Sequence, residues 1–173
     1  IAILQSGGAY VRYLPFAGIM EDKTKRRLLG VNCLILFFNM SWMALLVNQL
    51  GFNLFIFKCC LALGWMPFFL SMLFIFPTAR ASQLFILGMQ GIYMFALHAV
   101  SGLCLLLLFP DRPPNDLMIP HILIYDLFFA LTLPGAYRVF SPMLPSKRFM
   151  NEKQHSYYIA VIPLLIAMTA VPT

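Results

Sequence analysis

The stretch from Ala81 to Phe109 constrains the fold most, because it carries no formal charge apart from the titratable His98. A helix rises about 1.5 Å per residue, so this stretch can cross a hydrocarbon core of about 30 Å. Small residues recur along it at Gly88, Gly91, Ala96, Ala99 and Gly102. They favour close packing against other helices in a bilayer. The stretch therefore predicts a membrane-spanning helix.

The composition of the whole chain indicates the same class of protein. Of its 173 residues, 61% are hydrophobic and only 10% are charged, and the mean hydropathy is +0.84. A soluble domain has about 25% charged residues and could not bury this much apolar surface in its own core. The 12 Lys and Arg outnumber the 6 Asp and Glu. Because they cluster beside apolar spans, they indicate orientation in a lipid bilayer and no nucleic-acid partner.

The hydrophobic pattern predicts an all-α bundle of about six transmembrane spans, in a single membrane domain that covers residues 1–173. We place the spans at about 1–16, 28–50, 52–76, 81–109, 117–140 and 155–172. Proline interrupts the helical hydrogen bonds, so we expect breaks or kinks near Pro67, Pro134 and Pro163. The chain starts at an apolar Ile and stops within an apolar run, so we expect the first and last spans to be truncated.

Basic residues alternate between the predicted loops. Most lysines and arginines lie in or beside the loops 17–27, 77–80 and 141–154. The remaining loops carry none or, beside Asp111 and Asp116, only Arg112. The positive-inside rule therefore places the three basic loops in the cytoplasm. We expect a multi-pass protein of the plasma membrane.

Three ionisable side chains lie deep in the predicted spans, namely Lys58, His98 and Asp126. Their depths below the outer surface are about 9, 16 and 12 Å, respectively. A charge near mid-bilayer costs about 2.5–3.5 kcal/mol, so we expect Lys58 and Asp126 to form an ion pair with His98 nearby. Other readings stay open: Lys58 reaches the headgroups, His98 only packs, or Asp126 is protonated and hydrogen-bonded.

Gln90 and Tyr125 complete the candidate set of intramembrane polar residues. The amide side chains of the spans predict helix–helix hydrogen bonds, each worth about 0.6 kcal/mol. The four cysteines show neither metal-ligand spacing nor a secreted disulfide pattern: they are Cys33, Cys59, Cys60 and Cys104. The chain also lacks a phosphate-binding Gly-rich loop, HExxH, GxSxG and paired carboxylates at helical spacing. We predict no catalytic residue, cofactor or metal site.

Four groups of phrases stand out along the chain. They are Tyr13-Leu14-Pro15-Phe16 followed by Lys25-Arg26-Arg27; Phe76-Pro77-Thr78-Ala79-Arg80-Ala81-Ser82-Gln83-Leu84-Phe85; Leu131-Thr132-Leu133-Pro134 with Tyr137-Arg138; and Ile162-Pro163-Leu164-Leu165. Together they resemble the membrane sensor region of GHKL-type sensor histidine kinases from Gram-positive bacteria. The phosphoacceptor helix and the ATP-binding domain of that family are absent from the sequence.

The resemblance implies a signal-input module of a two-component system. Such a module would detect a peptide or an apolar small molecule at or within the outer leaflet and relay the signal by helix repacking. The parent protein would be an ATP-dependent histidine kinase, a transferase, and would form a homodimer.

Two other functions stay open from the sequence. His98 and Cys104 are similar to the nucleophile pair of membrane cysteine peptidases that process autoinducer peptides. On a helix, however, residues at this spacing face different ways and lie about 9 Å apart along the axis. Lys58 and Asp126 would also suit a small transporter or channel subunit.

Overall fold

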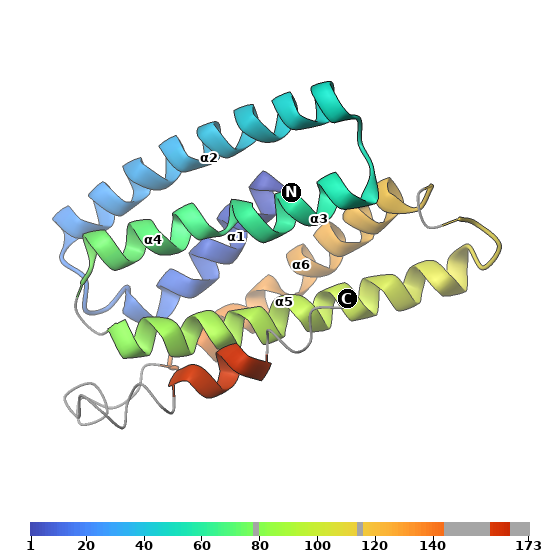
Figure 1. The fold of residues 1–173 in the computed structure, drawn as a ribbon. Coiled ribbons are helices and arrows are strands. Elements are labelled where there is room, and N and C mark those ends of the chain that lie inside the picture. Colours follow the sequence, from blue (N-terminus) through green and yellow to red (C-terminus); the bar gives the residue numbers. More distant parts are fainter. Residues whose placement is uncertain (78–79, 114–115, 144–159, 167–173) are drawn as a thin grey trace.

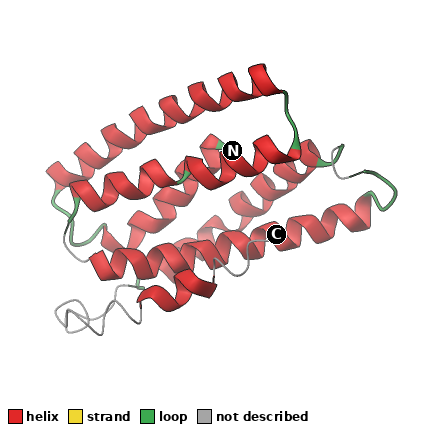
Figure 2. Cartoon of the chain, viewed as in Figure 1, coloured by secondary structure: helices red, strands yellow, loops and turns green. Residues whose placement is uncertain are grey.

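The computed structural model describes residues 1–77, 80–113, 116–143 and 160–166, apart from the side chains of residues 54, 58, 61 and 62. Within these residues the fold is all-α and has no strand (Figures 1 and 2). The helices are α1 (Ala2–Tyr13), the 3-10 helix η1 (Leu14–Phe16), α2 (Asp22–Leu50), α3 (Leu54–Gly64), α4 (Met66–Ile75), α5 (Arg80–Leu108) and α6 (Met118–Phe140). Residues 160–166 are also helical. The predicted fold class, a polytopic helical bundle, is confirmed.

Three of the described helices, α2, α5 and α6, are long and apolar enough to cross a membrane. The shorter helices α3 and α4 have 11 and 10 residues and follow one another directly. Together they reach about the length of one span. The break between them falls at Trp65, next to Pro67 in the first turn of α4, where a missing N–H is tolerated. The break predicted in the third span is therefore confirmed.

The start of α2 differs from its predicted position. We expected a loop over residues 17–27, but α2 already begins at Asp22. The carboxylate of Asp22 complements the helix dipole, and its Oδ1 lies 3.1 Å from Nζ of Lys25. The charged segment is thus the first turns of a helix, and the loop is limited to the residues before it. Of the predicted sixth span, only residues 160–166 fall within the described part.

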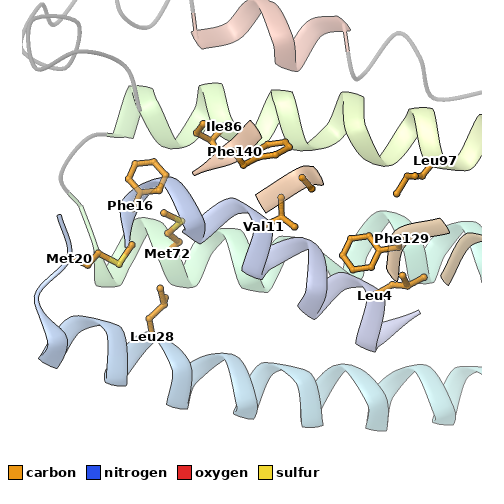
Figure 3. Packing of buried hydrophobic residues seen from close by; sticks show 11 residues of the cluster. Leu4, Val11, Phe16, Met20, Leu28, Met72, Ile86, Leu97, Phe129 and Phe140 are labelled. Atoms are coloured by element: carbon orange, nitrogen blue, oxygen red, sulfur yellow. The ribbon is translucent and has the colours of Figure 1, made fainter. Parts of the chain in front are cut away.

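The short helix α1 is the centre of the bundle, because it packs against α2, α4, α5 and α6 (Figure 1). Figure 3 shows Leu4 beside Phe129, and Phe16 beside Met72, in the main core cluster. The buried members of this cluster are Leu4, Val11, Phe16, Met20, Leu28, Met72, Ile86, Leu97, Phe129, Ala136 and Phe140. A smaller cluster of Ala2, Met43, Ile56 and Cys60 joins α1, α2 and α3.

Large apolar side chains cover the outside of the bundle. Phe37 is 73% exposed, Phe74 is 78% exposed and Leu107 is 74% exposed. A water-facing surface of this kind would be an aggregation site, whereas lipid chains solvate it without cost. The protein is therefore embedded in a membrane, and its apolar helices contact the bilayer.

Helices α2 and α5 run in one direction and α3, α4 and α6 run in the other, which gathers the basic residues at one end of the bundle (Figure 1). We call this the basic end; it carries the start of α2, the start of α5 and the end of α6. Its basic residues include Lys23, Lys25, Arg26, Arg27, Arg80 and Arg138. The opposite end carries Asp111, Arg112 and Asp116. This charge asymmetry has the form that the positive-inside rule describes.

Two asparagines of α2, Asn32 and Asn39, join it to other helices, as predicted for amide side chains within the spans. Oδ1 of Asn32 on α2 lies 3.1 Å from Oη of Tyr13 and 3.3 Å from Oγ of Ser71, which links α2 to α1 and α4. Nδ2 of Asn39 donates to the carbonyl of Gly64 at 2.7 Å.

Only some of the small residues of α5 lie close to another helix. A Cβ added at Gly88 would overlap the backbone of Leu164, whereas one added at Gly102 would have no neighbour within 4 Å. Ala96 and Ala99 are exposed. The second half of α5 therefore faces outward more than the sequence pattern suggested.

Candidate functional site: two polar clusters

The first polar cluster lies between α5 and α6 and consists of His98, Ser101, His121 and Tyr125; we call it the histidine cluster. The imidazole rings of His98 and His121 stack with their centroids 4.6 Å apart and an interplanar angle of 29°. The Tyr125 ring meets the His98 ring edge-on at 6.3 Å. Its hydroxyl donates to Sδ of Met94 at 3.2 Å.

Ser101 connects the two helices of the cluster. Its side chain is fully buried, and its Oγ atom lies 2.9 Å from the carbonyl of His98, to which it can donate. Nε2 of His121 lies 2.9 Å from the same Oγ atom. The cluster is thus a set of polar contacts that joins α5 and α6.

The histidine cluster lies away from the basic end. His121 is in the first turn of α6, which starts at Met118, and Ser101 is in the second half of α5. Both positions are near the loop that carries Asp111 and Arg112. The cluster thus lies in the half of the bundle opposite the basic end.

Two of the predicted candidates, His98 and Tyr125, come together in this cluster. Asp126 is half-buried, and its Oδ1 atom is buried without a hydrogen-bond partner among the described residues. The side chain of Lys58 lies outside the described part of the structure. The ion pair between Lys58 and Asp126 therefore stays a prediction.

Helix α1 contacts both of the helices that carry the predicted ion pair of Lys58 and Asp126. Nε2 of Gln5 donates to the carbonyl of Cys60 on α3 at 2.8 Å. A Cβ at Gly7 would meet the ring of Phe129 on α6 at 2.8 Å. Two residues subtend about 200° on a helix, so α1 contacts α3 and α6 with nearly opposite faces. Helix α1 thus contacts both α3, which carries Lys58, and α6, which carries Asp126.

The second polar cluster contains Arg12, the one charged residue among residues 1–20. Its side chain is 0% exposed, although it lies in the last turn of α1. The guanidinium carbon lies 5.6 Å from the ring centroid of Phe69 and 5.9 Å from that of Tyr13. None of its three nitrogen atoms has a hydrogen-bond partner in the described part of the chain.

The aromatic contacts do not balance the burial of this charge. Removing an ion from water costs several kcal/mol even after relaxation, and arginine does not give up its proton in proteins. A cation–π contact returns about 0.5–2 kcal/mol. The hydrogen-bonding capacity of the guanidinium is left unused within these residues. The positive charge of Arg12 is therefore buried without a compensating partner among the described residues.

The face of α1 that carries Arg12 contacts both α4 and α5, and the Arg12 guanidinium itself lies beside Phe69 of α4. Gly8 lies one turn before Arg12 on the same face, and a Cβ there would meet Nε2 of Gln90 at 2.6 Å. On α5, Oγ of Ser82 and Oε1 of Gln90 are buried and have no hydrogen-bond partner among the described residues. We call Arg12, Ser82 and Gln90 the Arg12 cluster. The predicted candidate Gln90 belongs here and not with the histidines.

His121, Ser101 and Arg12 were not among the candidates from the sequence. Arg12 had a usable signal, because it is the lone charge in an apolar segment. His121 had a weaker one: it lies one turn before Tyr125 and shares its helix face.

The described residues contain no group of three or more His, Cys, Asp or Glu that could hold a metal ion. The four cysteines are free thiols. No family model, no curated protein and no solved structure matches the chain. The class of the protein, a polytopic α-helical membrane bundle, thus comes from its fold and surface.

Proposed function

We propose that the chain is the signal-input module of a two-component sensor histidine kinase in the plasma membrane. The support comes from the phrases that resemble GHKL-type kinases and from the position of the histidine cluster. In this proposal the loops 17–27, 77–80 and 141–154 face the cytoplasm, and the parent kinase acts as a homodimer.

The observation that carries the proposal is the polar contact between α5 and α6. The stacked rings of His98 and His121 lie toward the end that the positive-inside rule assigns to the outer side. A peptide or an apolar small molecule with one hydrogen-bonding group could insert there and separate the two rings. Since α5 continues from this cluster to the basic end, a change in its packing would reach the cytoplasmic side. The ligand would act through its different affinities for the two packings.

The same contacts favour a sensor over a cysteine peptidase. A general base must lie within hydrogen-bond reach of its nucleophile. The ring of His98 packs on His121, and Cys104 lies six positions further along α5. This spacing turns the two side chains about 240° apart around the helix axis.

Two measurements test the proposal. The coding sequence downstream of Thr173 should encode a phosphoacceptor histidine and an ATP-binding domain. Autophosphorylation of that full-length kinase in membrane vesicles should then change severalfold in His121→Phe. This variant keeps a ring for stacking but removes the contact with Ser101.

The matched control is Leu107→Ala, because Leu107 is on α5 and faces lipid. It should leave autophosphorylation unchanged. A downstream sequence without a kinase, or a His121→Phe kinase that responds like the wild type, would contradict the proposed function.

A further inference from the structure

We infer that Arg12 is a binding residue for an oxyanion of the phosphate type, held inside the bundle where α1 faces α5. The site would be centred on the Arg12 guanidinium, which is fully buried and has no hydrogen-bond partner among the described residues. It is separate from the histidine cluster, which lies toward the other end of α5. The inference does not depend on the proposed function.

The described acidic residues leave Arg12 without a counter-charge, which indicates an anionic ligand. Five of the six acidic residues lie in the described part of the chain, and none pairs with Arg12; they are Glu21, Asp22, Asp111, Asp116 and Asp126. The ion pair between Lys25 and Asp22 is the one formed within these residues. An acceptor with negative charge is what a fully buried guanidinium lacks. Phosphate and carboxylate oxygens match its planar set of donors, in which two N–H groups can bind two oxygens at once.

The basic end provides a route and an attraction for the ligand. Arg12 lies four residues before the end of η1, which corresponds to a depth of about 6 Å. Around that end lie Lys23, Arg26, Arg27, Arg80 and Arg138. Their combined positive potential concentrates anions, including anionic lipid headgroups. Two sources can thus supply the phosphate: the headgroup of an anionic phospholipid and free inorganic phosphate.

The test measures ligand binding to the full chain in maltoside micelles, which contain no phosphate. The thermal midpoint of unfolding is compared after addition of phosphatidylglycerol, of an uncharged glycolipid, or of inorganic phosphate at constant ionic strength. Phosphatidylglycerol should raise the midpoint and the glycolipid should not, because a ligand that binds the folded state stabilises it. A rise with inorganic phosphate as well would identify a free anion as a second source.

Variants locate the effect at Arg12. In Arg12→Gln the dissociation constant for phosphatidylglycerol should rise roughly tenfold or more, because a charge-assisted pair is lost. Arg12→Lys should keep part of the affinity, since it preserves the charge but not the planar donors. The matched comparison is Arg26→Gln, an exposed arginine at the same end; it lowers only the general attraction and should weaken binding clearly less than Arg12→Gln does.

One competing partner is Glu152, which lies outside the described residues. If neither phosphatidylglycerol nor phosphate shifts the wild-type midpoint, and Glu152→Gln destabilises the chain as much as Arg12→Gln does, the counter-charge is internal and the inference is wrong. Equal loss of binding in Arg26→Gln and Arg12→Gln would also overturn it, because binding would then be a property of the surface charge.

Discussion

Nδ2 of Asn39 on α2 donates a hydrogen bond of 2.7 Å to the backbone carbonyl of Gly64, the last residue of α3. The end of a helix leaves carbonyl groups without their intrahelical donors, and a membrane supplies no water to replace them. Nε1 of Trp42 donates to Oδ1 of Asn39 at 2.9 Å and holds the amide in this orientation. The Asn39 side chain of α2 therefore supplies a hydrogen-bond donor for a carbonyl group at the break between α3 and α4.

We predict that Asn39→Leu destabilises the bundle by about 1–3 kcal/mol, because it leaves the Gly64 carbonyl buried without a donor. Reversible unfolding in mixed micelles measures this difference. The control is Asn48→Leu, at an exposed position of the same helix, which should change the free energy of unfolding by no more than about 0.5 kcal/mol. Equal losses in the two variants would show that the hydrogen bond contributes nothing specific.

A second prediction concerns the helix at residues 160–166. The methyl group in Gly88→Ala would overlap the backbone of Leu164, which cannot rotate away as a side chain can. We expect a loss of about 1–3 kcal/mol, as for other overpacked sites. Gly102→Ala on the same helix has open space and should be neutral or stabilising by up to about 1 kcal/mol. Thermal unfolding of the two variants should therefore shift in different directions; equal shifts would place residues 160–166 away from Gly88.

The third prediction concerns orientation. With the four native cysteines replaced by serine, Lys23→Cys should react with an impermeant thiol reagent only from the cytoplasmic side. Arg112→Cys should react only from the outer side, because it lies at the opposite end of the bundle. Both positions are exposed, so access across the membrane is the variable that is measured. Reaction of both cysteines from one side would contradict the topology.

The sequence predicted the long apolar helices well because hydropathy and proline act locally. The expected span at residues 81–109 is α5, Arg80–Leu108, and the break expected at Pro67 falls at Trp65. Contacts between helices depend on their relative register, which a hydropathy pattern does not contain. The stack of His98 on His121 is of this kind, and so is the burial of Arg12. Arg12 lies in a helix too short to span the bilayer, where a charge suggests proximity to water.

The last prediction measures the coupling of His98 and His121. Stacked aromatic side chains gain about 0.5–1.5 kcal/mol beyond the burial of their area. The double variant His98→Ala with His121→Ala should therefore be more stable than the sum of the single losses by about this amount. Unfolding of the four proteins in mixed micelles gives the coupling energy.

The control for this cycle pairs His121→Ala with Thr132→Ala. Thr132 is on the same helix as His121 but lies about 16 Å further along the axis. Its Oγ1 atom lies 2.7 Å from Oη of Tyr93. The effects of these two changes should add within about 0.5 kcal/mol, as they do for distant sites. Additive effects for His98 and His121 as well would mean that the rings do not stack in solution. In that case only the contact between Ser101 and His121 would join α5 and α6 at the histidine cluster, and the ring separation proposed for the signal would lose its basis.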